Sequence, residues 1–138
     1  MLRRSPDRIL AGLWQGVSGG LELNERIVDG ALRELVEETG FRRDNLDAFY
    51  DLDQVNQFHV AKIDSVVSAA VFAARLRPGI EPRLSHEHDA AEWLAPDAAI
   101  RRSVWPAYRE SIRRIVDHLL DPDVARWFVI PVGDRAVD

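Results

Sequence analysis

GGLELNERIVDGALRELVEETGF, residues 19–41, is the stretch of this sequence that decides the fold. It places glycines and charged residues at fixed offsets, namely Gly19, Glu25, Arg33, Glu34, Glu37, Glu38 and Gly40. Gly19 and Gly20 follow a short apolar stretch and allow the backbone to approach another segment or a ligand closely. An acidic helix with a solvated face would account for the three clustered glutamates, but not for the glycines, Glu25 and Arg33 at these offsets.

The same stretch predicts a helix that begins at about Ile27 and ends at Gly40, a residue type that commonly terminates helices in the left-handed conformation. Apolar residues at about 100° per residue form its predicted buried face: Val28, Ala31, Leu32, Leu35 and Val36. The carboxylates of Glu34, Glu37 and Glu38 occupy the adjacent arc, at positions i, i+3 and i+4.

This acidic cluster predicts a metal site. Like charges at these spacings destabilise a helix, and the negative end of the helix dipole adds to the cost. Arg33 lies four residues before Glu37, but one guanidinium cannot neutralise three carboxylates. A bound cation would, and hard oxygen ligands without Cys or His favour Mg²⁺, with Mn²⁺ as a substitute.

Length and composition indicate one globular domain over residues 1–138, with 46% hydrophobic and 30% charged residues. The net charge of −5 argues against a nucleic-acid-binding surface. The absence of cysteine excludes disulfides, thiol nucleophiles and zinc–thiolate sites. No apolar run has spanning length, and residues 1–6 lack the apolar core of a signal peptide. We therefore expect a cytoplasmic protein with no membrane partner.

The remaining periodicities predict strands at residues 46–52, 55–60, 66–76 and 91–94, with a break near Gln54. One helical turn is predicted at 96–100, and a longer helix at about 105–120 with Pro106 in its first turn. Strands between the helix predicted from Ile27 to Gly40 and this C-terminal helix make an α/β/α layered domain. The tail, residues 121–138, is predicted only as a packing arm.

The chain resembles the Nudix hydrolases. Residues 19–41 match the Nudix box at every fixed position, and a chance match of seven residue types that each make up roughly 6–7% of proteins has a probability on the order of 10⁻⁸. Trp14-Gln15-Gly16-Val17-Ser18-Gly19 and the segment from Leu84 to Leu94 are similar to the branch of dATP and dihydroneopterin triphosphate pyrophosphohydrolases. The resemblance covers about residues 2–120 and implies an α/β/α sandwich with a mixed, mostly antiparallel sheet.

The resemblance also implies a function: Mg²⁺-dependent hydrolysis of a diphosphate linkage in a nucleoside or pterin triphosphate, giving a monophosphate and pyrophosphate. Glu34, Glu37 and Glu38 would hold the cations, Arg33 would orient the carboxylates, and Gly19 would lend its carbonyl to the metal. Glu34 or Glu87 would deprotonate the water, and Glu87 is also a candidate metal ligand. The alternatives are a dinucleoside polyphosphate or nucleotide-sugar hydrolase, and a non-catalytic nucleotide sensor, whose box would be expected to be eroded.

The aromatic residues and the two histidines near these motifs are assigned either to substrate binding, to the core or to the surface. Trp14, with Gln15 and Ser18, is expected to contact substrate because it precedes the box loop directly. The other aromatic residues considered are assigned to core packing: Phe49, Tyr50, Phe58 and Trp93. His86 and His88, on either side of Glu87, are expected to be surface residues.

The N-terminus departs from the family pattern. Nudix domains normally carry a full strand ahead of the segment that leads into the box, and here Leu2-Arg3-Arg4 resembles only the end of one. A shortened or missing strand would leave a sheet edge exposed. We therefore expect either a homodimer that shields this edge or a shortened form of a longer product.

Overall fold

The computed structural model describes residues 1–132. Its elements, in chain order, are β1 (Leu2–Arg4), β2 (Trp14–Gln15), α1 (Ile27–Thr39), η1 (Arg43–Asn45), β3 (Leu46–Val60), β4 (Ser65–Leu76), β5 (His88–Ala91), α2 (Pro96–Arg102), α3 (Pro106–Arg114), the π-helical segment η2 (Ile115–Leu119) and α4 (Pro122–Ala125).

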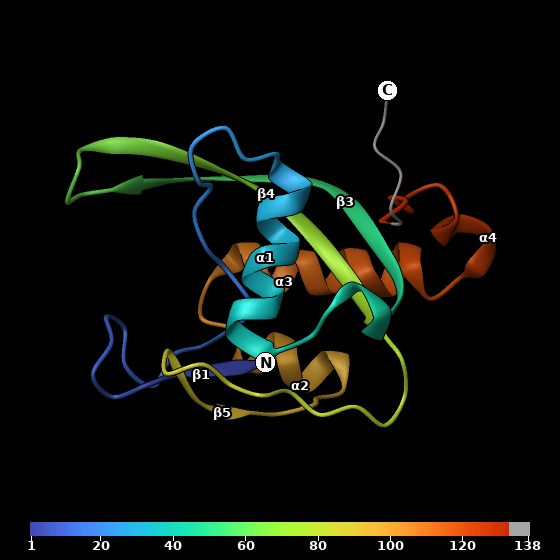
Figure 1. The fold of residues 1–138 in the computed structure, drawn as a ribbon, viewed down its shortest axis with the longest axis horizontal. Helices are drawn as coiled ribbons and strands as arrows, with labels where there is room; N and C mark the ends of the chain where they lie inside the picture. Colours follow the sequence, from blue (N-terminus) through green and yellow to red (C-terminus); the bar gives the residue numbers. More distant parts are fainter. Residues whose placement is uncertain (133–138) are drawn as a thin grey trace.

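The helices α1 and α3 cover opposite faces of the antiparallel pair β3–β4 (Figure 1). Alternation along the strands divides the core in two. One cluster joins Leu32 of α1 to Leu46 and Phe49 of β3. The other joins Tyr50 and Leu52, on the opposite face of β3, to residues of the C-terminal helical segments such as Leu119. The predicted α/β/α layering is therefore confirmed.

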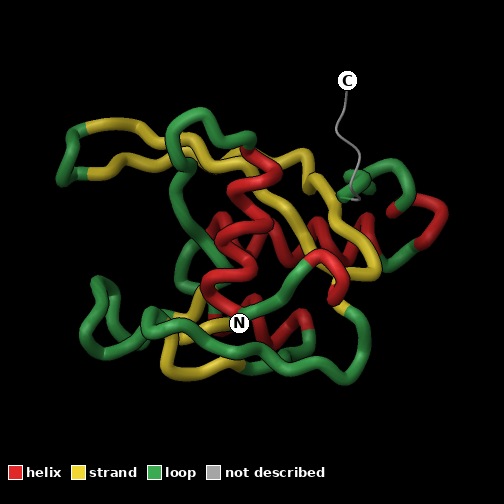
Figure 2. The backbone as a smooth tube through the Cα atoms, viewed as in Figure 1, coloured by secondary structure: helices red, strands yellow, loops and turns green. Residues whose placement is uncertain are grey.

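A second sheet has the strand order β2-β1-β5, with both pairings antiparallel. The short N-terminal strand predicted at Leu2-Arg3-Arg4 is present and lies in the centre of this sheet. The amino group of Met1 donates a hydrogen bond of 2.7 Å to the Glu92 carbonyl and anchors its start. Long loops join β2 to α1 and β4 to β5, and they carry the box loop and the segment before β5 (Figure 2).

The break predicted near Gln54 is a bulge inside one long strand. The β3–β4 register shifts between Asp51 and Val55, Asp53 has a φ of 48°, and its N–H is bonded to the Asp51 carboxylate at 2.9 Å. A bulge inserts extra residues without ending the pairing, so β3 continues to Val60. The resulting hairpin extends past the helices (Figure 1), which leaves Phe58 exposed and corrects its assignment to the core.

The outer edges of the β3–β4 pair differ. Residues 128–130 cover β3, since the Asp51 N–H donates to the Phe128 carbonyl at 2.9 Å and the Ile130 N–H donates to the Phe49 carbonyl at 2.8 Å. This part of the tail is a packing arm as predicted, whereas residues 133–138 lie outside the described chain. Within residues 1–132, β4 makes backbone hydrogen bonds only to β3. The homodimer expected at an exposed edge stays a prediction.

Three other expectations need correction. β5 spans His88–Ala91 instead of 91–94, because pairing of Leu2 with Ala91 sets its end. The helix predicted at about 105–120 is α3 up to Arg114 and has π geometry from Ile115 to Leu119. Val36 is 36% exposed, because the buried arc of α1 centres on Leu32 and leaves Val36 at its margin. No helix within residues 1–132 has the length and apolar character needed to cross a membrane.

Candidate active site

The box helix is positioned from both ends. At its C-terminus Gly40 adopts the left-handed conformation (φ 73°) and its N–H donates to the Val36 carbonyl at 2.8 Å. Near its N-terminus Gly30 is buried under the preceding loop. A Cβ there would lie 2.5 Å from the Leu21 side chain and 2.9 Å from a Glu25 oxygen. The spacing of the motif predicts no role for Gly30, yet the absence of a side chain at this residue allows the loop to pack on the helix.

Arg33 is the centre of the site's hydrogen bonds. Its Nε and Nη2 donate to the two carboxylate oxygens of Glu25 at 2.8 and 3.0 Å, and Nη2 also donates to the Gly20 carbonyl at 2.8 Å. Its Nη1 donates to Glu34 at 2.9 Å and to Glu37 at 3.1 Å. The predicted Arg33–Glu37 contact is present, but the bidentate partner is Glu25, which ties the loop to the helix.

This network shifts the pKa of Glu25. The hydrogen bonds from Arg33, and then the one from the Glu22 N–H, lower the Glu25 pKa from its ordinary value of 4.5 to about 2. A carboxyl with a lower pKa in the folded state binds protons more readily when unfolded. Its ionised form therefore stabilises the fold above pH 4.5, and the contribution is lost as the pH falls from 4.5 towards 2.

We expect Glu25→Gln to be less stable than the wild type at neutral pH and to approach it as the pH falls below 4.5. Urea denaturation of both proteins across this range measures the difference. Glu22→Gln, which removes the same charge from an exposed side chain, is the control. A stability difference that stays constant with pH would show that the Glu25 charge is not what stabilises the loop.

Gly19 lies against the carboxylate of Glu34. A Cβ built on Gly19 would fall 1.8 Å from the Glu34 Cδ atom, so only glycine fits while Glu34 keeps this position. Gly20 faces open space on its Cβ side. The first glycine of the box thus permits a close approach between backbone and acid, and the second supplies a carbonyl to Arg33.

Glu38 lies on the inner side of the helix, where its side chain is 4% exposed. Its Oε1 accepts a hydrogen bond from the Ser18 N–H at 3.3 Å, and its Oε2 lies 2.8 Å from Nε2 of His88. Burial raises the Glu38 pKa above its ordinary value, and hydrogen bonding to His88 partly opposes this shift.

The expectation that His88 is a surface residue is wrong, because its side chain is 0% exposed. The segment before β5 is bonded to the end of α1, since the Arg83 N–H donates to the Thr39 carbonyl at 2.7 Å and the Ser85 N–H to the Glu38 carbonyl at 3.2 Å. This docking turns His88 inward. His86 is exposed, as expected. The only sequence signal for an inward His88 would have been a strand that begins at this residue, because successive side chains of a strand point to opposite faces.

Glu87 makes its ion pair with β1 and not with the box helix, although its charge is near enough to Glu38 to contribute to the raised pKa of that residue. Its side chain is partly exposed and lies 3.7 Å from Nη1 of Arg4, and its carbonyl accepts from the Ser5 N–H at 2.9 Å. The segment thus brings Glu87 to the strand β1 while His88 takes the contact with the box helix.

Two of the three residues predicted to contact substrate, Trp14 and Gln15, lie on opposite faces of β2, and Ser18 follows in the loop. Gln15 is buried and its Nε2 donates to the hydroxyl of Ser18 at 3.4 Å, and the Ser18 N–H is in turn bonded to Glu38. Trp14 instead contacts the guanidinium groups of Arg3 and Arg102, whose Cζ atoms are 5.8 and 4.6 Å from its ring centroid. Adjacent residues of a strand face opposite sides, which explains the division.

Tyr108 of α3 is a neighbour of the site that the sequence assigned only to an apolar stripe. A Cβ on Gly16 would lie 3.3 Å from its ring, so the tyrosine packs against the loop that leads to Ser18. Burial raises the Tyr108 pKa. It is therefore a neutral hydroxyl at neutral pH.

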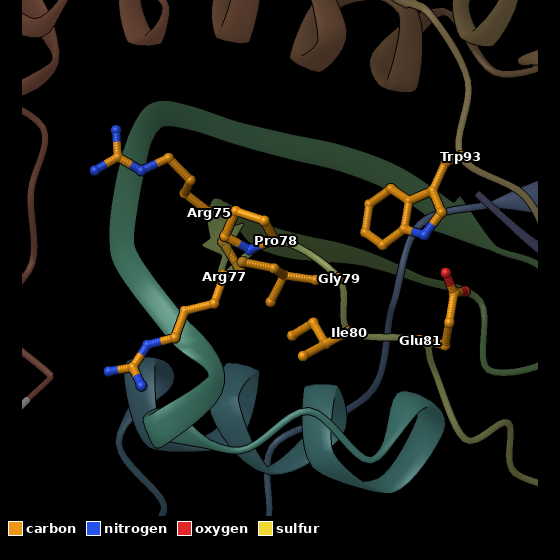
Figure 3. Close-up of a pocket in the computed structure, with 9 residues that line it drawn as sticks. Arg75, Arg77, Pro78, Gly79, Ile80, Glu81 and Trp93 are labelled. Atoms are coloured by element: carbon orange, nitrogen blue, oxygen red, sulfur yellow. The ribbon is translucent and has the colours of Figure 1, made fainter.

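A cavity of about 460 Å³ lies apart from these groups, between the end of β4, the loop after it, and Trp93 (Figure 3). The Trp93 ring faces Ile80, and the side chains of Arg75 and Arg77 point away from it. Trp93 is 64% exposed, so its assignment to the core is wrong. None of the box carboxylates lines this cavity.

The donor set fits a hard divalent cation in its chemistry. Glu34 and Glu37 already converge on one positively charged nitrogen, Nη1 of Arg33, and the Gly19 backbone lies against Glu34. In this arrangement the described residues include no group of three acidic or histidine side chains that surrounds a common point. Arg33 and His88 hold the carboxylates in place, and a cation would share their oxygens.

One protein of similar sequence is much longer than this chain. An octanoyltransferase of Myxococcus xanthus is 35% identical over 116 residues, which are 83% of this chain but only 31% of that protein. The chain thus spans about a third of this relative's length, and the name octanoyltransferase refers to that longer protein as a whole.

Two solved structures are similar over most of their length. The Caenorhabditis elegans Ap4A hydrolase has a TM-score of 0.71 at 21% identity, covering 86% of this chain and 83% of its own. The Escherichia coli dihydroneopterin triphosphate pyrophosphohydrolase has a TM-score of 0.70 at 21% identity, covering 84% and 91%. At these identities the likeness concerns the fold. The family description "NUDIX domain" matches residues 1–115. Because that match takes in the box, both sheets and most of the helical layer, the chain belongs to the Nudix family.

Proposed function

We propose that this chain is a Mg²⁺-dependent hydrolase of a phosphoanhydride bond, and that its substrate is a nucleoside or pterin triphosphate cleaved to a monophosphate and pyrophosphate. The observation that carries the proposal is the convergence of Glu34 and Glu37 on one cationic nitrogen, with Glu38 held beside them by Ser18 and His88. Mn²⁺ would replace Mg²⁺, since both prefer oxygen ligands.

Each residue has a part in that chemistry. Glu34, Glu37 and Glu38, with the Gly19 carbonyl, would hold the cation, which when bound neutralises charge on the phosphate oxygens and favours ionisation of water. Arg33 orients Glu34 and Glu37 and keeps the loop closed through Glu25. Glu34 or Glu87 would take the proton of the attacking water. Trp14, Gln15 and Ser18 would contact the substrate, and Ser18 would do so next to Glu38.

The substrate proposal is supported by the neighbours, one of which is named for dihydroneopterin triphosphate and the other for Ap4A. A dinucleoside polyphosphate or nucleotide sugar is therefore the alternative substrate class. A sensor that binds nucleotide without cleaving it is disfavoured by the intact box. One fold accommodates all three functions, so the reaction has to be measured.

The test is a screen of nucleoside triphosphates, dihydroneopterin triphosphate, dinucleoside polyphosphates and nucleotide sugars with Mg²⁺, scored by product mass. We expect a monophosphate and pyrophosphate from one triphosphate, and no turnover when the metal is chelated. Cleavage of only the dinucleotide or sugar class would replace the substrate proposal, and binding without cleavage of any compound would contradict the enzyme.

Glu87→Gln tests the second candidate base. If Glu87 takes the proton or holds the metal, its loss acts on the chemical step, so we expect kcat to fall more than KM rises. A fall of about 10²-fold is the lower range for a general base. Steady-state kinetics against His86→Ala, an exposed neighbour, measure it. Equal and small effects of both changes would leave Glu34 as the base.

The remaining proposals concern the protein's surroundings. We propose a cytoplasmic enzyme with a small-molecule substrate, no nucleic-acid or membrane partner, and a homodimer that covers an exposed sheet edge. The net charge of −5 supports the lack of a nucleic-acid partner, and within residues 1–132 the edge of β4, which pairs only with β3, is open to a second copy of the chain.

A further inference from the structure

His88 and Glu38 form a buried pair whose geometry is defined on both sides. His88 Nε2 lies 2.8 Å from Glu38 Oε2, with the histidine side chain 0% and the glutamate side chain 4% exposed. On the other side, the Ser18 N–H donates to Oε1 at 3.3 Å. Each carboxylate oxygen therefore has one donor, and the carboxylate plane has little freedom to rotate.

Within residues 1–132 the imidazole of His88 has no hydrogen-bond partner other than Glu38. Nδ1 of His88 is buried and has no hydrogen-bond partner among residues 1–132, so the imidazole's only polar contact is with this carboxylate. An ionised carboxylate can only accept hydrogen bonds, so in the contact with ionised Glu38 the hydrogen lies on Nε2 of His88. A buried histidine with an unsatisfied nitrogen costs stability, and a role in holding the acid gives a reason to keep it.

The two carboxylate oxygens of Glu38 have different surroundings. Oε2 faces the interior and is occupied by His88, whereas Oε1 faces the box loop, where its bond to Ser18 is long. A carboxylate oxygen has two lone pairs, so Oε1 keeps one for a further partner on the loop side, next to Gly19. The hydrogen bonds to His88 and Ser18 therefore orient Oε1 in the metal-free protein.

We propose that His88 is a positioning residue: its Nε2–H holds Oε2 of Glu38 so that Oε1 is presented to the divalent cation. The inference rests on the proposed function, since it concerns how a proposed metal ligand is held. Groups that orient metal ligands from behind raise affinity for the metal, and their loss costs about 10–100-fold.

The test measures Mn²⁺ affinity by electron paramagnetic resonance, with no substrate present. His88→Leu removes the donor and keeps an apolar side chain, and we expect its Mn²⁺ dissociation constant to rise by about 10-fold or more. His88→Gln carries an amide at a reach similar to Nε2 and should keep most of the affinity, whereas His88→Asn is too short to reach Oε2. His86→Leu, on the exposed neighbour, should leave the affinity unchanged.

A double-mutant cycle separates positioning from general structural damage. In a Glu38→Gln background the further change His88→Leu should weaken Mn²⁺ binding no more, because His88 acts through Glu38. An equal loss in both backgrounds, or wild-type affinity in His88→Leu, would overturn the proposal. If His88→Leu does not fold by circular dichroism, the Gln and Asn variants decide, and equal affinities for those two would also overturn it.

The outcomes distinguish this inference from the proposed function. A wild-type protein that binds no Mn²⁺ contradicts the metal-dependent function itself. A wild type that binds Mn²⁺ and turns over substrate, with His88 variants that bind equally well, contradicts only the positioning role.

Discussion

Glu37→Gln and Glu38→Gln are each expected to lower kcat by roughly 10³-fold, since a metal site contributes several kcal/mol of charge stabilisation and about 1.4 kcal/mol corresponds to a factor of ten. Both changes keep the shape of the side chain and remove its charge. Steady-state kinetics with saturating Mg²⁺ on the substrate identified by the screen measure the effect. Glu22→Gln, an exposed change of the same kind, should leave kcat unaltered.

The two variants should differ in stability without metal. Glu37 is exposed, with a single ion pair to Arg33, so its loss should change the melting temperature little. Glu38 is buried and its ionised form is disfavoured by burial, so neutralising it should leave the metal-free protein as stable or more stable. Near-wild-type turnover in both variants would contradict the metal assignment. A marked destabilisation of either would indicate a structural role for these acids.

Gly19→Ala should produce the second large effect. Its Cβ would meet the Glu34 carboxylate at 1.8 Å, so the loop or the acid has to move by more than an ångström. A displacement of about 1 Å at a catalytic group can cost roughly 10²-fold in rate. We therefore expect kcat/KM to fall by about that factor, measured under the same conditions as for the glutamate variants.

Gly20→Ala is the matched control for this change. A Cβ on Gly20 meets nothing within 4 Å, and the carbonyl that accepts from Arg33 is unchanged. Its activity should stay close to that of the wild type. Similar losses in both alanine variants would mean that loop flexibility, not the Gly19–Glu34 approach, is what the enzyme needs.

Much of the site could be predicted because its residues lie on one helix. The offsets from Arg33 to Glu38 place their side chains within one and a half turns, and the 3.6-residue period determines which share a face. The Arg33–Glu37 contact follows from the same spacing. The bidentate partner Glu25 was recognised only as part of the motif, since a loop residue has no fixed direction until the loop packs at Gly30.

The sequence did not determine the directions of side chains that depend on how a segment packs. Trp14 and Gln15 are neighbours in sequence but face opposite sides of β2, and only the pairing of β2 with β1 decides which one faces Ser18 and which one Arg102. Trp93 and Phe58 are apolar enough for a core, yet each lies where no second layer covers it.

The sequence by itself determined the family, the α/β/α layering, the box helix and the carboxylates on its acidic face. These features depend on periodicity and on short, fixed spacings, which are local properties of a chain. Only the tertiary structure decided that His88 turns inward to Glu38, 50 residues away in sequence, while Glu87 beside it turns to Arg4. The reason is that backbone hydrogen bonds from Arg83 and Ser85 to the end of α1 set the direction of that segment, and no local pattern specifies such a long-range contact.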